Sequence, residues 1–192
     1  RLLDFSAIEF DQLGAVRNRS GNFSQYSAPS NVYRTKDDQW ASIAASTQSI
    51  FQRLVAVMGK PELLVDPRFA TNPDRVRNRA AIDAIVAAWI ASRNMAEIVR
   101  DLDAAEVGFS PINSIDKVFE DPQFVARDAI VNVSDKELGV VKMQNVVPRF
   151  TRTPGKVRSA GPTLGEHNAE VYGDWLDLSV EQQQQLQSEG VI

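Results

Sequence analysis

The chain has 192 residues, with 21 Lys and Arg against 25 Asp and Glu, so its formal net charge is −4. It contains no cysteine and one histidine, which excludes disulfide scaffolds, Cys/His zinc sites, cysteine nucleophiles and any site that needs two imidazoles. The negative charge balance argues against a nucleic-acid partner. Carboxylate chemistry stays open.

The N-terminal segment predicts a short helix followed by a loop. A helical stripe ends at Gly14, and its members are Leu2, Leu3, Phe5, Ile8, Phe10 and Leu13. Acidic residues interrupt this segment, so it predicts neither a signal peptide nor a membrane span, and we expect a cytoplasmic protein. The chain begins with Arg1 rather than Met, which suggests a piece of a longer protein. Residues 17–30 are rich in turn formers and predict a loop.

A β-hairpin and several helices are expected next. Residues 31–35 and 40–45 have the branched and aromatic residues of two strands, joined by an acidic turn. Apolar periodicity predicts a helix over 46–58. Asn72-Pro73-Asp74 is expected to start one helix, with Asn72 as its capping side chain and an apolar stripe that reaches Ile90. Asn94 with Glu97 forms a capping box for a helix that ends at Gly108. Two short helices are expected to start at Ser114 and at Asp121-Pro122, where Asp121 has a turn or cap role.

The pattern changes near residue 130. Residues 130–133 and 140–143 predict strands, whereas 148–165 are rich in Pro, Gly and Arg and show no period. Helices are expected over 169–176 and from Ser179, which forms a second capping box with Gln182. A tail of this kind has few partners of its own, so we expect it to pack on a surface that this chain does not contain.

The residues provide no self-contained active site. His167 lies at the start of a helix without an evident orienting acid, and we interpret it as a helix-start residue making backbone contacts rather than as a general base. Phosphate-binding, dinucleotide-binding and nucleophile-elbow motifs are absent. We therefore predict no catalytic residue and no metal ligand in this chain.

Two groups of side chains have a structural interpretation as well as a functional one. Four arginines could meet a phosphate, but we favour a solvated helix face for them: Arg68, Arg75, Arg77 and Arg79. The three tryptophans, Trp40, Trp89 and Trp175, fall in apolar stripes and are expected in a core rather than at a ligand.

A series of short motifs carries a family resemblance from about Arg17 to the last residue. In chain order they are Ser20-Gly21-Asn22, Ala28-Pro29, Tyr33-Arg34-Thr35-Lys36-Asp37, Trp40, Asp66-Pro67-Arg68-Phe69, Arg75, Asn78, Asp121-Pro122-Gln123, Ala126-Arg127, Pro162-Thr163-Leu164-Gly165-Glu166-His167 and Gly190-Val191-Ile192. Each motif is weak by itself, but their order is specific. The series resembles the C-terminal half of family III CoA-transferases, which include formyl-CoA transferase, the carnitine CoA-transferases and α-methylacyl-CoA racemase.

The resemblance implies a fold and an assembly. It implies an α/β fold with a linker helix and loop over 1–30, a small α/β domain over 31–128 with a short antiparallel sheet and several helices, and a segment over 129–192 that returns to a Rossmann-like large domain. That large domain is missing from this chain. In the family, two complete chains thread each other as an interlocked homodimer.

The resemblance also implies an activity. The family's transferases move CoA from an acyl-CoA to a free carboxylic acid through an anhydride on an aspartate, which divides one difficult exchange into easier steps. Coenzyme A is then a substrate, and no covalent cofactor is expected. The aspartate belongs to the large domain, so this chain should be inactive alone. Two alternatives remain: an α-methylacyl-CoA racemase or epimerase, and a non-catalytic binding or assembly module of the same fold.

The resemblance places one substrate-binding element in this chain. In the formyl-CoA transferase branch, a glycine-rich loop over the reaction intermediate corresponds to about Gly21 to Tyr26. Only Gly21 is glycine here, which argues against a mobile glycine lid. The implied substrate-binding residues are Gly21, Asn22, Ser24 and Gln25. The hairpin turn also departs from the family's Asp-Gly, because it reads Asp37-Asp38, and this leaves a different turn type open.

Overall fold

The computed structural model describes residues 5–192, which form two compact units, Arg1–Asn113 and Ser114–Ile192. We call them unit 1 and unit 2 and describe each by itself. The mixed α/β fold with antiparallel sheets and several helices is confirmed. The division at residues 30 and 128 stays a prediction.

Unit 1 begins with the expected helix, α1 (Ser6–Leu13). It ends where Gly14 adopts a left-handed conformation, φ +65°, and donates its N–H to the carbonyl of Phe10. Leu2 and Leu3, which we assigned to the apolar stripe, lie outside the described residues. No residue of α1 is buried, so within unit 1 this apolar stripe is left uncovered.

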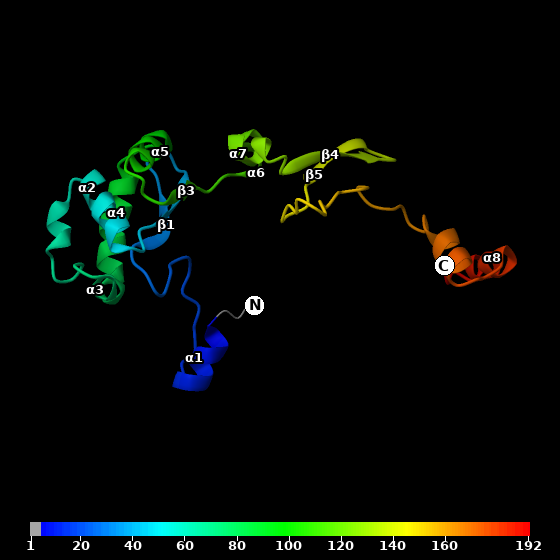
Figure 1. The fold of residues 1–192 in the computed structure, drawn as a ribbon, viewed down its shortest axis with the longest axis horizontal. Helices are drawn as coiled ribbons and strands as arrows, with labels where there is room; N and C mark the ends of the chain where they lie inside the picture. The colour runs from blue at the N-terminus through cyan, green and yellow to red at the C-terminus, as the bar shows by residue number, and fades with distance from the viewer. Residues whose placement is uncertain (1–4) are drawn as a thin grey trace. The chain divides into compact units, whose positions relative to one another are not determined.

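The sheet of unit 1 has the expected hairpin and one further strand. Strands β1 (Ser30–Arg34) and β2 (Trp40–Ala44) pair antiparallel, and β3 (Phe109–Pro111) pairs with the other edge of β2 (Figure 1). Strand β3 was not predicted, since three residues that end in proline show no alternation. Asp38 adopts φ +64° in the hairpin turn, so an aspartate occupies the left-handed conformation that the family's glycine would favour.

Helices pack against the sheet. They are α2 (Gln48–Val57), the 3₁₀ helix η1 (Pro61–Leu64), α3 (Asn72–Arg77), α4 (Arg79–Ala91) and α5 (Met95–Ala104). The capping box of Asn94 and Glu97 is confirmed. The single helix predicted from Asn72 is two helices, because the backbone leaves helical geometry at Asn78 (φ −105°, ψ 29°). The cap of α3 is Thr71 rather than Asn72, because the Thr71 hydroxyl accepts the N–H of Asp74.

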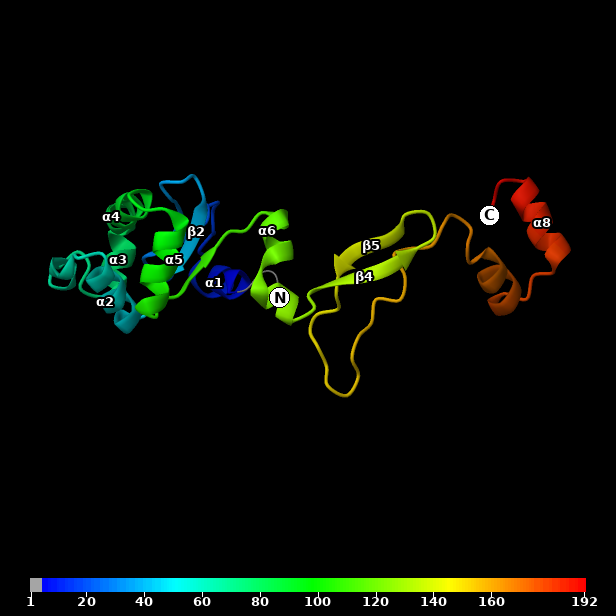
Figure 2. The same cartoon turned by 90° about the horizontal axis from the view of Figure 1, so that it is seen from above.

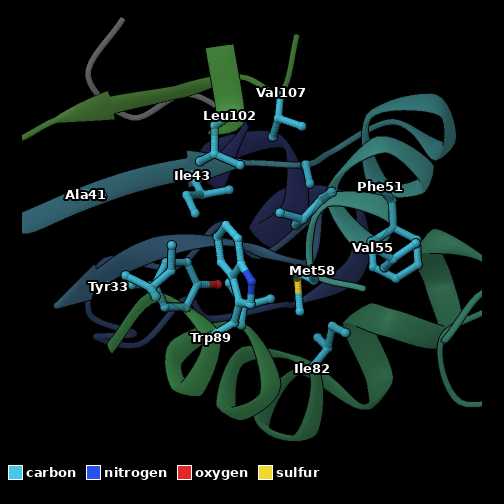
Figure 3. Close-up of a cluster of buried hydrophobic side chains, with 14 of the residues drawn as sticks. Tyr33, Ala41, Ile43, Phe51, Val55, Met58, Ile82, Trp89, Leu102 and Val107 are labelled. Atoms are coloured by element: carbon cyan, nitrogen blue, oxygen red, sulfur yellow. The ribbon is translucent and has the colours of Figure 1, made fainter. Parts of the chain in front are cut away.

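One hydrophobic core joins these elements (Figure 3). Alternation along β2 turns Ala41 and Ile43 into the core, where they meet Tyr33 of β1 and side chains of α2, α4 and α5. The fully buried apolar side chains include Phe51, Leu54, Ile82, Val86, Ile90, Ile98 and Leu102. The Tyr33 hydroxyl donates to Asp83 at 2.6 Å, and burial together with this bond raises the pKa of Tyr33 well above its usual value.

Of the three tryptophans expected in a core, only Trp89 is buried. It is 6% exposed and belongs to the core of unit 1. Trp40 is 46% exposed because it lies on the face of β2 opposite to Ala41, and Trp175 is 68% exposed at the end of a short helix. The prediction was wrong for these two side chains.

Unit 2 consists of small elements joined by long irregular stretches (Figure 2). Its elements are α6 (Ile115–Glu120), α7 (Pro122–Ala126), the hairpin of β4 (Ile130–Asp135) and β5 (Gly139–Gln144), the π-helix η2 (Ala169–Trp175) and α8 (Val180–Ser188). All were expected from the sequence, including the cap of α7 by Asp121 and the capping box of Ser179 with Gln182. As predicted, 148–165 contains no helix or strand.

Unit 2 has almost no core of its own. Val133 is its one buried hydrophobic side chain among the described residues. Many large apolar side chains are exposed, among them Phe150, Leu164, Trp175 and Val191. None of the described helices in either unit combines the length and apolar character needed to cross a bilayer.

The core of unit 1 predicts a large cost for removing a buried side chain. Leu102 is fully buried in it. Leu102→Ala should lower the free energy of unfolding by about 2–5 kcal/mol, through lost apolar burial and the cavity left behind. Val65 is 82% exposed, and Val65→Ala should change stability by less than about 0.5 kcal/mol. Urea unfolding monitored by tryptophan fluorescence measures both, and equal effects of the two changes would contradict this core.

A carboxylate in unit 2 predicts a pH effect. Glu166 accepts hydrogen bonds from Lys136 Nζ (2.5 Å) and from the N–H of Thr163 (2.9 Å), which lower its pKa from 4.5 to about 2. Because the folded pKa is depressed, the stability that this group contributes is complete above pH 4.5 and is lost as the pH falls to about 2.

Lys136→Met should therefore raise the pKa of Glu166 toward 4.5, as followed by NMR titration of its carboxyl carbon. Lys117 pairs with Glu120 instead, so Lys117→Met is the matched control and should leave Glu166 unchanged. A pKa near 4.5 in the unmodified protein would show that the Lys136 contact does not persist in solution.

Candidate functional site

The four implied substrate-binding residues lie on one loop between α1 and β1, here called the 20–27 loop. Ser24 donates its N–H to the carbonyl of Ser30 at 2.9 Å, and its hydroxyl oxygen accepts from the N–H of Tyr26 and the hydroxyl of Ser27. Gln25 reaches the hydroxyl of Ser20 at 3.5 Å. Gly21 and Asn22 are exposed, and Gly21 has φ +74°. The loop is thus internally hydrogen-bonded, with its polar groups accessible.

The end of the loop is fastened to the helices by three side chains. The side-chain amide of Asn72 donates to the Tyr26 carbonyl at 2.8 Å and accepts the N–H of Ala28 at 3.2 Å. Arg79 donates to the carbonyl of Ser27 at 3.0 Å. Arg75 donates from Nε to the carbonyl of Ala28 at 2.7 Å. Three consecutive carbonyl groups, those of residues 26, 27 and 28, therefore each accept from a different side chain of α3 or α4.

These contacts correct part of the prediction for the arginine cluster. Arg68 and Arg77 are exposed and pair with Asp66 and Asp74, as a solvated surface requires. Arg75 is 0% exposed, and the guanidinium of Arg79 lies 4.5 Å from the centre of the Phe23 ring. A solvated helix face is therefore wrong for Arg75, since its side chain runs inward beneath the loop.

The other side of the loop contacts α1. The hydroxyl of Tyr26 donates to Glu9 at 2.9 Å, and Glu9 also pairs with Arg17 at 2.6 Å. The Arg17 guanidinium lies 5.0 Å from the centre of the Tyr26 ring. The C-terminal end of the loop, at Tyr26, is consequently held by α1 as well as by α3.

Two hollows among the described residues lie away from this loop. One, of about 440 Å³, is lined by Lys60, Ala84, Ile85, Ala88 and Trp89 of unit 1. The other, of about 250 Å³, lies within unit 2 between α6, α7 and the hairpin of β4 and β5, beside Phe119 and Lys142. The 20–27 loop is an open polar surface.

The described residues contain no assembled acid–base or metal centre. His167 is exposed, and its Nδ1 lies 3.5 Å from Glu170, one turn further along the chain. Its carbonyl accepts the N–H of Val171, in line with the helix-start role expected for it. No group of three or more His, Asp or Glu side chains within residues 5–192 is arranged to hold a metal ion.

Comparison with known proteins identifies the family to which this chain belongs. The family described as CoA-transferase family III matches residues 1–168. The chain belongs to CoA-transferase family III. The resemblance inferred from the short motifs is therefore confirmed.

Individual relatives in the family are enzymes with CoA-transferase names. Succinyl-CoA–D-citramalate CoA-transferase of Chloroflexus aurantiacus is 40% identical over 191 residues, which is 100% of this chain and 48% of that protein. Formyl-CoA:oxalate CoA-transferase of Streptomyces avermitilis is 34% identical over 139 residues, which is 72% of this chain and 34% of that protein. A solved CaiB/BaiF family protein from Brucella suis superposes with a TM-score of 0.71 at 30% identity, covering 90% of this chain and 44% of that one.

The coverages compare the length of this chain with that of its relatives. The chain spans about half the length, or less, of the family members it matches.

The left-handed backbone conformation of Gly21 predicts which substitutions this position tolerates. A Cβ added at Gly21 would meet no atom within 4 Å, so only the positive φ opposes a side chain. Gly21→Ala should cost about 1–2 kcal/mol of stability, and Gly21→Asn less, because asparagine tolerates this conformation. Urea unfolding of the three proteins measures the difference. Equal losses for Ala and Asn would mean that something other than the backbone conformation at Gly21 sets the cost.

Proposed function

We propose that the complete protein transfers CoA from an acyl-CoA to a free carboxylic acid through an aspartyl-acyl anhydride. The observation that carries the proposal is the 40% identity to a named CoA-transferase over 100% of this chain. We place the aspartate outside these residues, in the half of the relatives that has no counterpart here. On this account the 192-residue chain is inactive alone.

The relatives suggest a donor to test first. Three of them carry succinyl-CoA–L-malate CoA-transferase in their names and one carries succinyl-CoA–D-citramalate CoA-transferase. We therefore propose succinyl-CoA as the donor, with a hydroxylated dicarboxylic acid as the acceptor. Coenzyme A is a substrate in this reaction and not a resident cofactor.

The chemistry proceeds by successive attack at three carbonyl carbons: that of the donor thioester, that of the aspartate and that of the acceptor. An aspartate oxygen attacks the thioester carbonyl, the C–S bond breaks, and CoA leaves as a thiolate. The acceptor carboxylate then attacks the aspartyl carbonyl of the anhydride and expels the donor acid. Finally the thiolate attacks the acceptor's carbonyl carbon, which forms the new thioester and frees the aspartate. No step consumes a redox equivalent or a metal ion.

The 20–27 loop is proposed to contact the acyl group. The Ser24 hydroxyl oxygen already accepts two hydrogen bonds, so its own proton is available to an oxygen of the substrate. Gln25 would contribute its side-chain amide, and the exposed Gly21 and Asn22 would leave room for backbone and amide contacts. These groups can orient a carboxylate or thioester oxygen without taking part in bond making.

The remaining surface is proposed to serve assembly. Unit 2 buries only Val133 among its described apolar side chains and exposes many large ones, whereas an isolated protein rarely leaves large apolar patches uncovered. We propose that residues 129–192 return to a Rossmann-like large domain and that residues 31–128 act as the small domain of an interlocked homodimer. The coverage of the relatives supports this proposal, because half of each relative has no counterpart in these residues.

An isotope experiment tests the proposed reaction on the complete protein. With succinyl-CoA and an acceptor labelled with ¹⁸O in its carboxylate, the acceptor oxygen that bridges the second anhydride stays on the enzyme. Mass spectrometry should therefore find ¹⁸O in an aspartate after turnover, and none in a control without succinyl-CoA. Loss of α-deuterium from a substrate without any CoA exchange would instead identify a racemase and overturn the proposal.

A further inference from the structure

Arg75 is a buried cation whose hydrogen-bond acceptors are all neutral. Its Nε donates to the carbonyl of Ala28, and Nη1 donates to the carbonyl of Phe69 (3.0 Å) and to Gln48 Oε1 (2.9 Å). The guanidinium also lies 4.1 Å from the centre of the Phe51 ring. No carboxylate within residues 5–192 forms an ion pair with it. Burial lowers the pKa of Arg75 from its usual value, although arginine stays charged at any ordinary pH.

The position of the loop therefore affects how well the charge of Arg75 is solvated, because the Ala28 carbonyl is one of its few hydrogen-bond acceptors. A buried charge is costly unless it is hydrogen-bonded, and one terminal nitrogen, Nη2, already has no acceptor in the described part of the chain. If residues 26–28 moved away, Arg75 would lose its acceptor at Ala28 in a place that water does not reach. Displacing the loop therefore costs more than the loss of one surface hydrogen bond.

Two neighbouring side chains act at the same three residues. Asn72 holds both the Tyr26 carbonyl and the Ala28 N–H, and Arg79 holds the Ser27 carbonyl. Both come from the helix pair that carries Arg75, since α3 ends at Arg77 and α4 begins at Arg79. Because the helix breaks at Asn78, side chains of both α3 and α4 can hydrogen-bond to the backbone of residues 26–28.

We propose that Arg75, assisted by Asn72 and Arg79, is a positioning residue that holds the 20–27 loop in its binding conformation before substrate arrives. The inference rests on the proposed function, because it takes the loop to contact the acyl group. It assigns this loop a fixed conformation in place of the opening and closing of a glycine lid. None of the three anchors touches the reacting atoms.

The test combines hydrogen exchange with kinetics on the complete protein. Asn72→Ala removes two anchoring bonds without leaving a buried charge, and Arg75→Lys keeps the charge but not the planar fork. Arg77→Gln alters an exposed arginine of the same helix and is the matched control. The informative amides are those of Ser24 and Tyr26, whose acceptors are the Ser30 carbonyl and the Ser24 hydroxyl rather than an anchor.

In Asn72→Ala and Arg75→Lys, the amide hydrogens of Ser24 and Tyr26 should exchange with solvent at least ~10-fold faster than in the unmodified protein. The amides of β2 and α4 should keep their protection. In the same proteins kcat/KM for succinyl-CoA should fall on the order of 10- to 100-fold, because a misplaced binding group lowers productive orientation. Arg77→Gln should match the unmodified protein in both measurements. If Arg75→Lys fails to fold, Asn72→Ala decides alone.

Two results would overturn the inference. Unchanged exchange at Ser24 and Tyr26 in Asn72→Ala would show that the loop holds without its anchors. Faster exchange with unchanged kcat/KM would show that the loop's position does not matter for the reaction. A failure of the transferase proposal is distinguishable from these results. It would appear as missing ¹⁸O transfer in the unmodified protein, whereas the hydrogen-exchange rates would still report on the anchors.

Discussion

The buried guanidinium of Arg75 is the constraint around which unit 1 is organised. A cation removed from water must be hydrogen-bonded, and here the bonds go to a loop, to α2 and to the turn before α3. These segments are far apart in the sequence, and each is adjacent to part of the hydrophobic core through Ala28, Phe51 or Phe69. The charge therefore ties the approach of the 20–27 loop to the packing of the core. A hydrophobic side chain in its place could fill the volume but could not specify the path of the backbone.

The two units differ in how much apolar surface each buries within itself. Unit 1 buries side chains from its sheet and from several helices in one core, whereas unit 2 buries Val133 and exposes most of its large apolar residues. Because apolar burial is the main favourable term in folding, unit 2 needs additional surface to reach a stable arrangement. The proposed large domain would supply that surface. The family comparison, in which relatives are about twice as long as this chain, is consistent with such a partner.

Local signals in the sequence predicted most of the elements, and long-range contacts account for what they missed. The capping boxes at Asn94 and Ser179 and the cap at Asp121 have side-chain patterns that depend on residues two or three positions away. Strand β3 was missed because its three residues become a strand only by pairing with β2. Trp40 belongs to an apolar stretch, yet its face of the sheet is decided by the register of the hairpin.

Arg75 shows why the site was only partly predictable. The resemblance indicated the loop, and the structure keeps Gly21, Asn22, Ser24 and Gln25 together on it because they are neighbours in the chain. The anchors were not predicted, since backbone carbonyls are their acceptors and every residue has one. An arginine directed at carbonyls has no complementary acid in the sequence, so Arg75 could not be distinguished from the exposed Arg77 two positions later.

The most direct test of this account is a structure of the complete protein with CoA and a succinyl group bound. The account predicts that Ser24 or Gln25 lies within hydrogen-bond distance of the acyl group, and that the loop keeps the Arg75 bond to the Ala28 carbonyl that it has here. It would be contradicted by an acyl group bound away from residues 20–27, or by a loop that has released Arg75 to close over the substrate.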